Sequence, residues 1–174
     1  MITISVHGAA VLAPRLACFT ALTDHHLAPN QMGCAGAGAL RPHPTFITSL
    51  EHLSRLSLPD NDMCVEDITV LASPLACLSS LVLLDLQSNR IGNEGAAVLG
   101  LHLASLPWLH RLILADTGIV AQGACTLLPH LTSLTVLRDV NLAEDAIGPE
   151  RASALDVTSQ GSHASRIYFW KAAR

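Results

Sequence analysis

Reactive side chains are common in this 174-residue sequence, but their spacing matches no catalytic motif. The sequence has no G-x-S-x-G nucleophile elbow, no phosphate-binding loop, no dinucleotide-binding G-x-G-x-x-G and no H-E-x-x-H zinc motif. The glycine-rich stretch at 33–38 is not followed by the Lys-Ser/Thr pair that a phosphate loop requires. Serine, histidine and aspartate are plentiful, but a composition match without geometry is no evidence for a triad. We therefore expect a protein that is not an enzyme and needs no cofactor.

A metal site is equally unsupported by the spacing of the cysteines and histidines. Cys18, Cys34, His25 and His26 are near one another in sequence but match no zinc-ligand pattern. The five cysteines are odd in number and scattered, which disfavours a disulfide framework and favours free thiols in a reducing compartment. The N-terminal residues lack the positively charged start of a secretory signal. We expect a cytoplasmic protein with no metal.

Composition excludes several other classes of protein. Half of the residues are apolar, 14% are charged, and the net charge is −4, so the chain is neither disordered nor basic enough for nucleic acid. The uncharged run at 68–84 is shorter than the ~18–20 residues that span a bilayer, and it contains Pro74. Leucine occupies 30 positions, and such an excess directs attention to internal repeats.

Four segments of the chain align without gaps and follow one another at a constant spacing. They begin at Leu53, Leu81, Leu109 and Leu137 and fit L-x-x-L-x-L-x-x-N-x-(L/I). The alternating leucines predict a short strand with one side buried. Later in each unit, leucines at offsets of four and seven, such as Leu99, Leu103 and Leu106, predict one face of a helix. One unit cannot cover both faces, so the units must stack.

A polar column follows each predicted strand and consists of Asn61, Asn89, Thr117 and Asp145. A buried carboxamide there would bond backbone groups of the adjacent turn, which are costly to leave unpaired. Thr117 and Asp145 can do only part of that work, so we expect their two turns to be weaker.

The segment 81–106, LVLLDLQSNRIGNEGAAVLGLHLASL, resembles the ribonuclease-inhibitor type of leucine-rich-repeat protein, and the match extends over 53–148. The resemblance implies an α/β leucine-rich-repeat solenoid. This is a right-handed βα superhelix with short parallel strands inside the curve and helices outside, used mainly to bind proteins inside cells. On this basis residues 51–148 form the repeats, and 1–50 form a divergent first repeat or a cap. Residues 149–174 form a fraying helix followed by an aromatic capping strand around Ile167–Trp170.

In this family the outward strand positions form the concave face. Here they are Arg55, Ser57, Pro59, Leu83, Asp85, Gln87, Arg111, Ile113, Ala115, Asp139, Asn141 and Ala143. Neighbouring strands are ~4.8 Å apart, so we expect Arg111 to reach both Asp85 and Asp139. These charges form either a surface ion-pair ladder or a recognition patch, in which Arg111 is the anchor and Leu83 and Ile113 supply apolar contacts.

Two further features lie beside this face. Asp60, Ser88, Asp116 and Glu144 form a column just past the strands, which either attracts a basic partner or consists of solvated turn residues. Trp108 follows Pro107 at the end of a unit, and we expect its ring to be wedged between a helix and the next strand.

The sequence therefore favours a non-catalytic module that binds a protein of unknown identity through the concave face, without nucleic acid or membrane. An alternative is a regulatory or sensor fragment of a larger immune-type or cytoskeletal assembly protein, whose uncapped ends could self-associate. A remote alternative is a GTPase-activating repeat protein that uses Arg90, which lies in the first turn after a strand.

Overall fold

The structure, a computed structural model, describes residues 23–26, 52–147 and 166–168, and for 24–26 and 166–168 it describes the strand backbone. Most of the proposed N-terminal unit at 1–50 lies outside these residues. The helix expected after residue 149 and the aromatic residues 169 and 170 also lie outside them.

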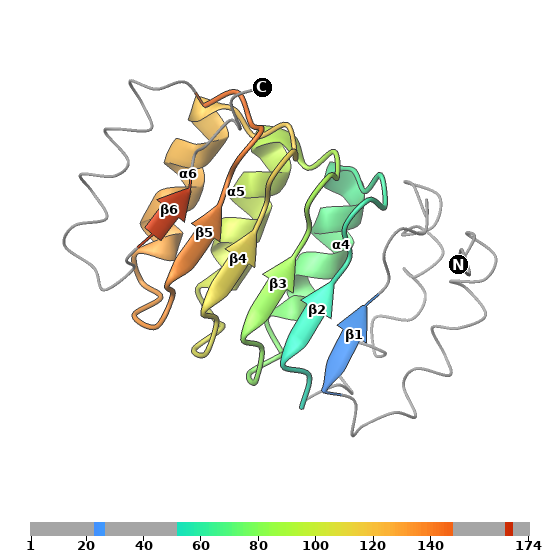
Figure 1. Ribbon diagram of the computed structural model, residues 1–174, viewed down its shortest axis with the longest axis vertical. Coiled ribbons are helices and arrows are strands. Elements are labelled where there is room, and N and C mark those ends of the chain that lie inside the picture. The colour runs from blue at the N-terminus through green and yellow to red at the C-terminus, as the bar shows by residue number, and fades with distance from the viewer. Residues whose placement is uncertain (1–22, 27–51, 148–165, 169–174) are drawn as a thin grey trace.

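Short parallel strands form a single sheet in the described part of the chain. Each strand is three residues long, and the order in the sheet follows the order in the chain, β1-β2-β3-β4-β5-β6 (Figure 1). The strands are β1 (Asp24–His26), β2 (Arg55–Ser57), β3 (Leu83–Asp85), β4 (Arg111–Ile113), β5 (Asp139–Asn141) and β6 (Arg166–Tyr168). Every neighbouring pair is parallel, so each connection must cross back before the next strand begins.

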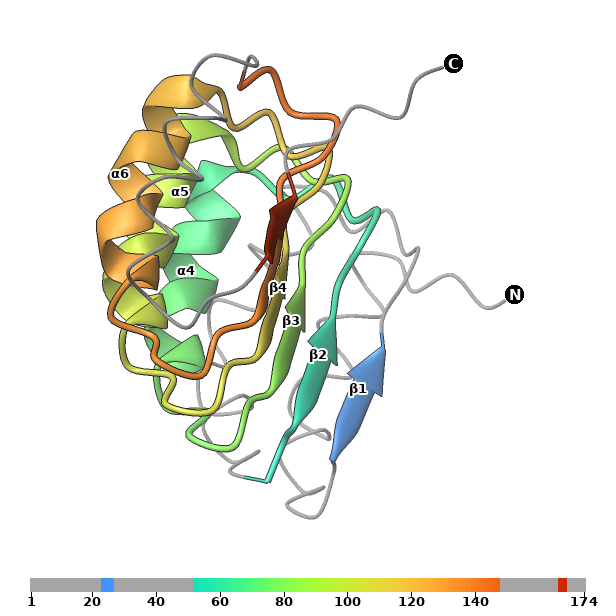
Figure 2. The same ribbon diagram turned by 60° about the vertical axis from the view of Figure 1, so that its left-hand side comes forward.

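Helices make three of these crossings. They are α4 (Val65–Leu75), α5 (Gly92–Leu103) and α6 (Ala121–Leu131), and they lie in one layer behind the sheet (Figure 2). The expected α/β repeat of strand and helix is therefore confirmed. Among the described residues, no helix has the length and apolar character to cross a membrane.

The leucine columns fill the space between the two layers. The inward strand residues Leu56, Leu84 and Leu112 are buried, as are the helix residues Leu71, Leu99 and Leu127. All belong to one continuous core that extends from Leu53 to Ile147. The apolar run at 68–84 is accounted for by α4 and β3, since all of its leucines except Leu83 are buried in this core.

The constant spacing of the repeats holds from β2 to β5 and changes at both ends. Arg55, Leu83, Arg111 and Asp139 are partners in register, as the repeat frame requires. The same frame would begin the first strand at Leu27 and the last at Ile167. The structure begins them earlier, at Asp24 and Arg166. The frame fails there because side-chain columns do not fix the length of a connection.

The second and third helices approach closely because residue 123 has no side chain. A Cβ atom on Gly123 would lie 2.9 Å from the Cα atom of Asn93, closer than real contacts allow. The Asn93 Oδ1 atom uses this proximity to accept the N–H groups of Val120 (3.0 Å) and Gly123 (3.1 Å) at the start of α6. One helix thus caps the next.

Truncation of Leu86 tests the stacked core. Leu86 is fully buried, and we expect Leu86→Ala to lower the free energy of unfolding by ~2–5 kcal/mol, because it leaves a cavity between the layers. Urea denaturation followed by circular dichroism measures this change. Val82→Ala, at a partly exposed position earlier in the same unit, is the control and should cost much less. A Leu86→Ala protein as stable as the wild type would contradict the stacking.

Candidate functional site

The outward residues of the strands form two parallel rows, which we call the strand face. The first row contains Arg55, Leu83, Arg111 and Asp139, and the second contains Ser57, Asp85, Ile113 and Asn141. The helices cover the opposite side of the sheet (Figure 2). The strands therefore bring eight of the twelve expected residues into one surface. The other four, Pro59, Gln87, Ala115 and Ala143, lie two residues beyond the ends of the strands.

Charge pairing on the strand face differs from the expectation in one respect. The Arg111 Nε atom lies 3.3 Å from Asp139 Oδ2, with 56% of the Arg111 side chain exposed. Asp85 does not join this pair, because it is in register with Ile113 rather than with Arg111. Its carboxylate instead accepts the Ser57 hydroxyl at 3.2 Å and the Gln87 N–H at 3.1 Å. The expected reach of Arg111 to both acids is therefore wrong for Asp85.

Two other positions on this face offer less surface than expected. Ser57 is only 9% exposed and Ala115 only 6%, so neither presents much area to a partner. Arg55, Gln87 and Arg111 are exposed, while Leu83 and Ile113 are half-buried.

Trp108 corrects a further expectation. Its side chain is 59% exposed rather than wedged between helix and strand. The buried positions at the end of this unit are taken by Leu106 and Leu109 on either side of it, so the ring has no interior place to fill.

The turns after the strands are joined by the polar column, which we call the turn ladder (Asn61, Asn89, Thr117 and Asp145). Asn89 is only 3% exposed, and both the oxygen and the nitrogen of its carboxamide form hydrogen bonds. Its Oδ1 atom accepts the N–H groups of Asn61 (3.3 Å) and Met63 (2.9 Å) in the preceding turn. Its Nδ2 atom donates to the carbonyls of Leu58 (3.0 Å) and Leu86 (2.8 Å). The carboxamide thereby pairs backbone groups that the turn cannot pair by itself.

Thr117 and Asp145 reproduce different halves of this pattern. The Asp145 Oδ1 atom accepts the N–H groups of Thr117 (2.9 Å) and Ile119 (3.1 Å), as a carboxamide oxygen would. The Thr117 hydroxyl donates to the Leu114 carbonyl at 2.7 Å, as a carboxamide nitrogen would. Burial raises the pKa of Asp145 to about 6, although the bonds from Thr117 and Ile119 pull it down. Asp145 thus replaces the acceptor half of the carboxamide, and Thr117 replaces the donor half.

Backbone conformation accounts for the residue types in the column past the strands. Asp60, Ser88, Asp116 and Glu144 all have positive φ, between 52° and 63°. In this left-handed region, short polar residues such as Asp are tolerated better than bulky or β-branched ones. Three of their N–H groups also extend the pairing of the strands, as in the bond from Ser88 to the Ala115 carbonyl at 2.9 Å.

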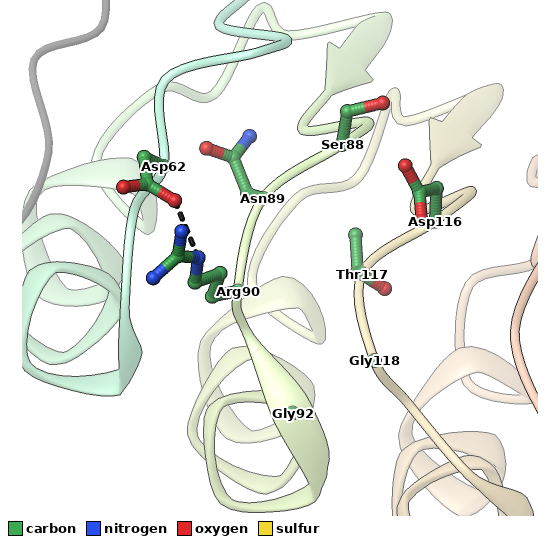
Figure 3. A pocket seen from close by; sticks show the side chains of 8 residues that line it. All are labelled: Asp62, Ser88, Asn89, Arg90, Gly92, Asp116, Thr117 and Gly118. Carbon is green, nitrogen blue, oxygen red and sulfur yellow. Dashed lines mark ion pairs between the residues drawn. The ribbon is translucent and has the colours of Figure 1, made fainter.

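A hollow lies beside the turn ladder, and we call it the turn pocket. It has a volume of about 430 Å³ and lies where the turns after β3 and β4 meet (Figure 3). Its lining residues are Asp62, Ser88, Asn89, Arg90, Gly92, Asp116, Thr117 and Gly118. Sequence reasoning missed this pocket. The sequence signal that could have indicated it is Thr117, which stands in the turn ladder where the two preceding repeats have asparagine.

Arg90 belongs to this pocket rather than to the strand face. It is exposed, and its Nε atom forms an ion pair with Asp62, toward which Figure 3 shows it turned. Within the described ranges, no group of three His, Cys, Asp or Glu side chains is placed to hold a metal ion.

Comparison with known proteins gives information on the fold. No described family and no curated protein matches the sequence. Among solved structures, actin-binding site 2 of leiomodin-1 is similar with a TM-score of 0.66 at 11% identity, over 75% of this chain and 78% of that chain. At this identity the similarity shows the fold alone, which is that of the leucine-rich repeats.

Two other similar structures overlap more loosely. An internalin (InlF) from Listeria monocytogenes gives a TM-score of 0.33 at 14% identity, over 90% of this chain and 57% of that chain. The plant peptide hormone receptor RGFR1, in complex with RGF2, gives 0.26 at 16% identity, over 72% of this chain and 29% of that chain.

Replacing Asp145 by asparagine tests the turn ladder. In the folded protein its pKa is about 6, above the ordinary value of 3.8, so ionisation opposes folding and the free energy of unfolding falls as pH rises through this range. We expect Asp145→Asn to be more stable than the wild type by on the order of 1 kcal/mol at about pH 8. The advantage should shrink toward about pH 4, where the wild-type carboxyl is protonated.

Urea denaturation at several pH values measures this difference. Asp145→Ala is the control, because it removes the charge together with the acceptor of the Thr117 and Ile119 N–H groups, and it should be less stable than Asp145→Asn throughout. A difference between wild type and Asp145→Asn that stays constant with pH would exclude this carboxyl as the titrating group.

Proposed function

We propose that this protein is a non-catalytic interaction module that binds a protein partner through the strand face. The observation that carries the proposal is the open surface of two rows. In the first row the exposed Arg55 and Arg111 flank the half-buried Leu83, and in the second the half-buried Ile113 lies between polar side chains. A surface of this kind supplies both apolar contact area and polar specificity. The helices cover the other side of the sheet, so this is the side on which the sheet is open to a partner.

Arg111 is the proposed anchor of this interface. It lies in the middle of the first row, between Leu83 and Asp139, and its exposed guanidinium is oriented by the Asp139 carboxylate. An exposed ion pair of this kind adds only ~0–1 kcal/mol to stability. Its greater value lies in recognition, because arginine beside apolar contacts is frequent among the residues that dominate binding energy.

We further infer that the repeats are of the ribonuclease-inhibitor type and curve into a right-handed superhelix with the strand face on its concave side. The constant step between the central strands and the helix in each complete described unit support this type. The leiomodin-1 structure, named as an actin-binding site, supports protein binding as a use of this fold and does not specify the partner here. A cytoplasmic location fits the free thiols of Cys64, Cys77 and Cys125.

Quantitative capture of partners from a lysate tests the strand face. We expect the double variant Arg111→Glu, Leu83→Asp to retain at least about tenfold less of each partner than the wild type, because it reverses the anchor charge and removes an apolar contact. Thermal unfolding must first show that the variant is folded.

The matched control is Arg138→Glu, Leu101→Asp. It makes the same changes of residue type at exposed positions outside the strand face, Leu101 being on α5. This control should retain wild-type binding. Equal losses in both double variants, or no loss in either, would contradict the proposed interface.

A further inference from the structure

The turn after β3, which borders the turn pocket, has two backbone donors whose counterparts form hydrogen bonds in both neighbouring turns. Asn61 and Met63 donate to Asn89 Oδ1, and Thr117 and Ile119 donate to Asp145 Oδ1. The equivalent donors in the turn between them are the N–H groups of Asn89 and Ile91. Among the described residues, no hydrogen bond from either group is formed.

Thr117 is the cause of this difference. Its side chain is shorter than a carboxamide, and its single oxygen donates to the Leu114 carbonyl at 2.7 Å. It also contacts the Asp145 carboxylate at 3.4 Å. Because the hydroxyl is turned toward Leu114, neither Asn89 nor Ile91 donates its N–H group to it in the described structure. Both Asn89 and Thr117 line the turn pocket, so this part of the turn ladder adjoins the hollow.

The charges around the pocket determine which acceptor fits. Arg90 is paired with Asp62, which reduces its attraction for an anion. Asp116 is exposed on the neighbouring turn and lines the same pocket, so it repels a carboxylate and accepts a hydrogen bond from a donor (Figure 3). A primary carboxamide combines the two requirements: its oxygen accepts from two N–H groups, and its NH₂ group donates to a carboxylate.

We propose that the turn pocket binds the carboxamide of an asparagine or glutamine side chain of a protein partner, which completes the turn ladder from outside. The proposal rests on protein binding as the proposed function. It adds a second contact region at the ends of the strands, next to Gln87 and the second row of the strand face. Binding of this kind would discriminate strongly, because a buried donor without an acceptor is costly.

The test uses acetamide as the probe and backbone amide resonances as the readout. Titration over the millimolar range should move the Asn89 and Ile91 resonances in a saturable way. Acetate carries a charge that Asp116 repels, and N,N-dimethylacetamide lacks the donors, so each should bind at least about tenfold more weakly. Equal shifts with all three probes, or no saturable shift with acetamide, would overturn the proposal.

Thr117 provides matched variants. Thr117→Asn supplies its own oxygen to Asn89 and Ile91, so it should abolish the acetamide shifts and raise the unfolding midpoint. Thr117→Ser keeps the hydroxyl and leaves the donors open, so it should bind acetamide within about twofold of wild type. Asp116→Asn is a second variant, exposed and remote from the core, and it should reduce the preference for acetamide over acetate. Unchanged binding by Thr117→Asn would overturn the assignment.

The outcome is independent of the strand-face experiment. The double variant Arg111→Glu, Leu83→Asp leaves the turn pocket intact and should bind acetamide as the wild type does. Failure of the strand-face proposal would thus appear as retained partners with normal acetamide titration, and failure of the pocket proposal as the reverse.

Discussion

Pairing of the backbone groups in the turns is the constraint on which the rest of the structure depends. Each strand has only three residues, so the chain reverses toward its helix almost at once, and the N–H and carbonyl groups of the turn are buried between units. Each unpaired group in this position would cost about 1–3 kcal/mol, which is comparable with what the burial of one leucine side chain contributes. The carboxamide of Asn89 removes that cost for two turns at once, since it bonds Met63 in the preceding turn and Leu86 in its own. Burial of leucine between the layers then becomes favourable.

The two kinds of contact between units have different geometry. Leucines pack through non-directional contacts and tolerate a range of positions, so the core is continuous although the units are not identical. The turn ladder and the Asn93 cap depend on hydrogen bonds at defined positions, and they fix how one unit is placed on the next. The register of the strand face follows from them. Arg111 lies opposite Leu83 and Asp139 because the strands pair in that register, not because the side chains on that face attract one another.

The sequence was sufficient for the repeat, the buried columns and the order of strands, because leucine periodicity reflects which side of each element is buried. It also indicated that Thr117 and Asp145 would replace asparagine incompletely. It was insufficient for features that depend on distances between units. The pairing of Asp85 with Ser57 rather than Arg111 follows from register, and the exposure of Trp108 follows from the places taken by Leu106 and Leu109. The turn pocket could not be predicted, because it depends on the positions of backbone N–H groups, which carry no sequence signal of their own.

The uneven turn ladder has a consequence for how the protein comes apart. Contacts in a stacked array are made between neighbours, so the strength of each junction, rather than the total buried area, decides where the array separates first. The junction at Asn89 is held by the full carboxamide, while those at Thr117 and Asp145 are each held by part of it. The turn ladder is therefore weakest between the Asn89 and Thr117 turns, where the Asn93 cap at the start of α6 supplies hydrogen bonds of its own. Separation at this junction has to break the helix cap as well as the contacts of the turn.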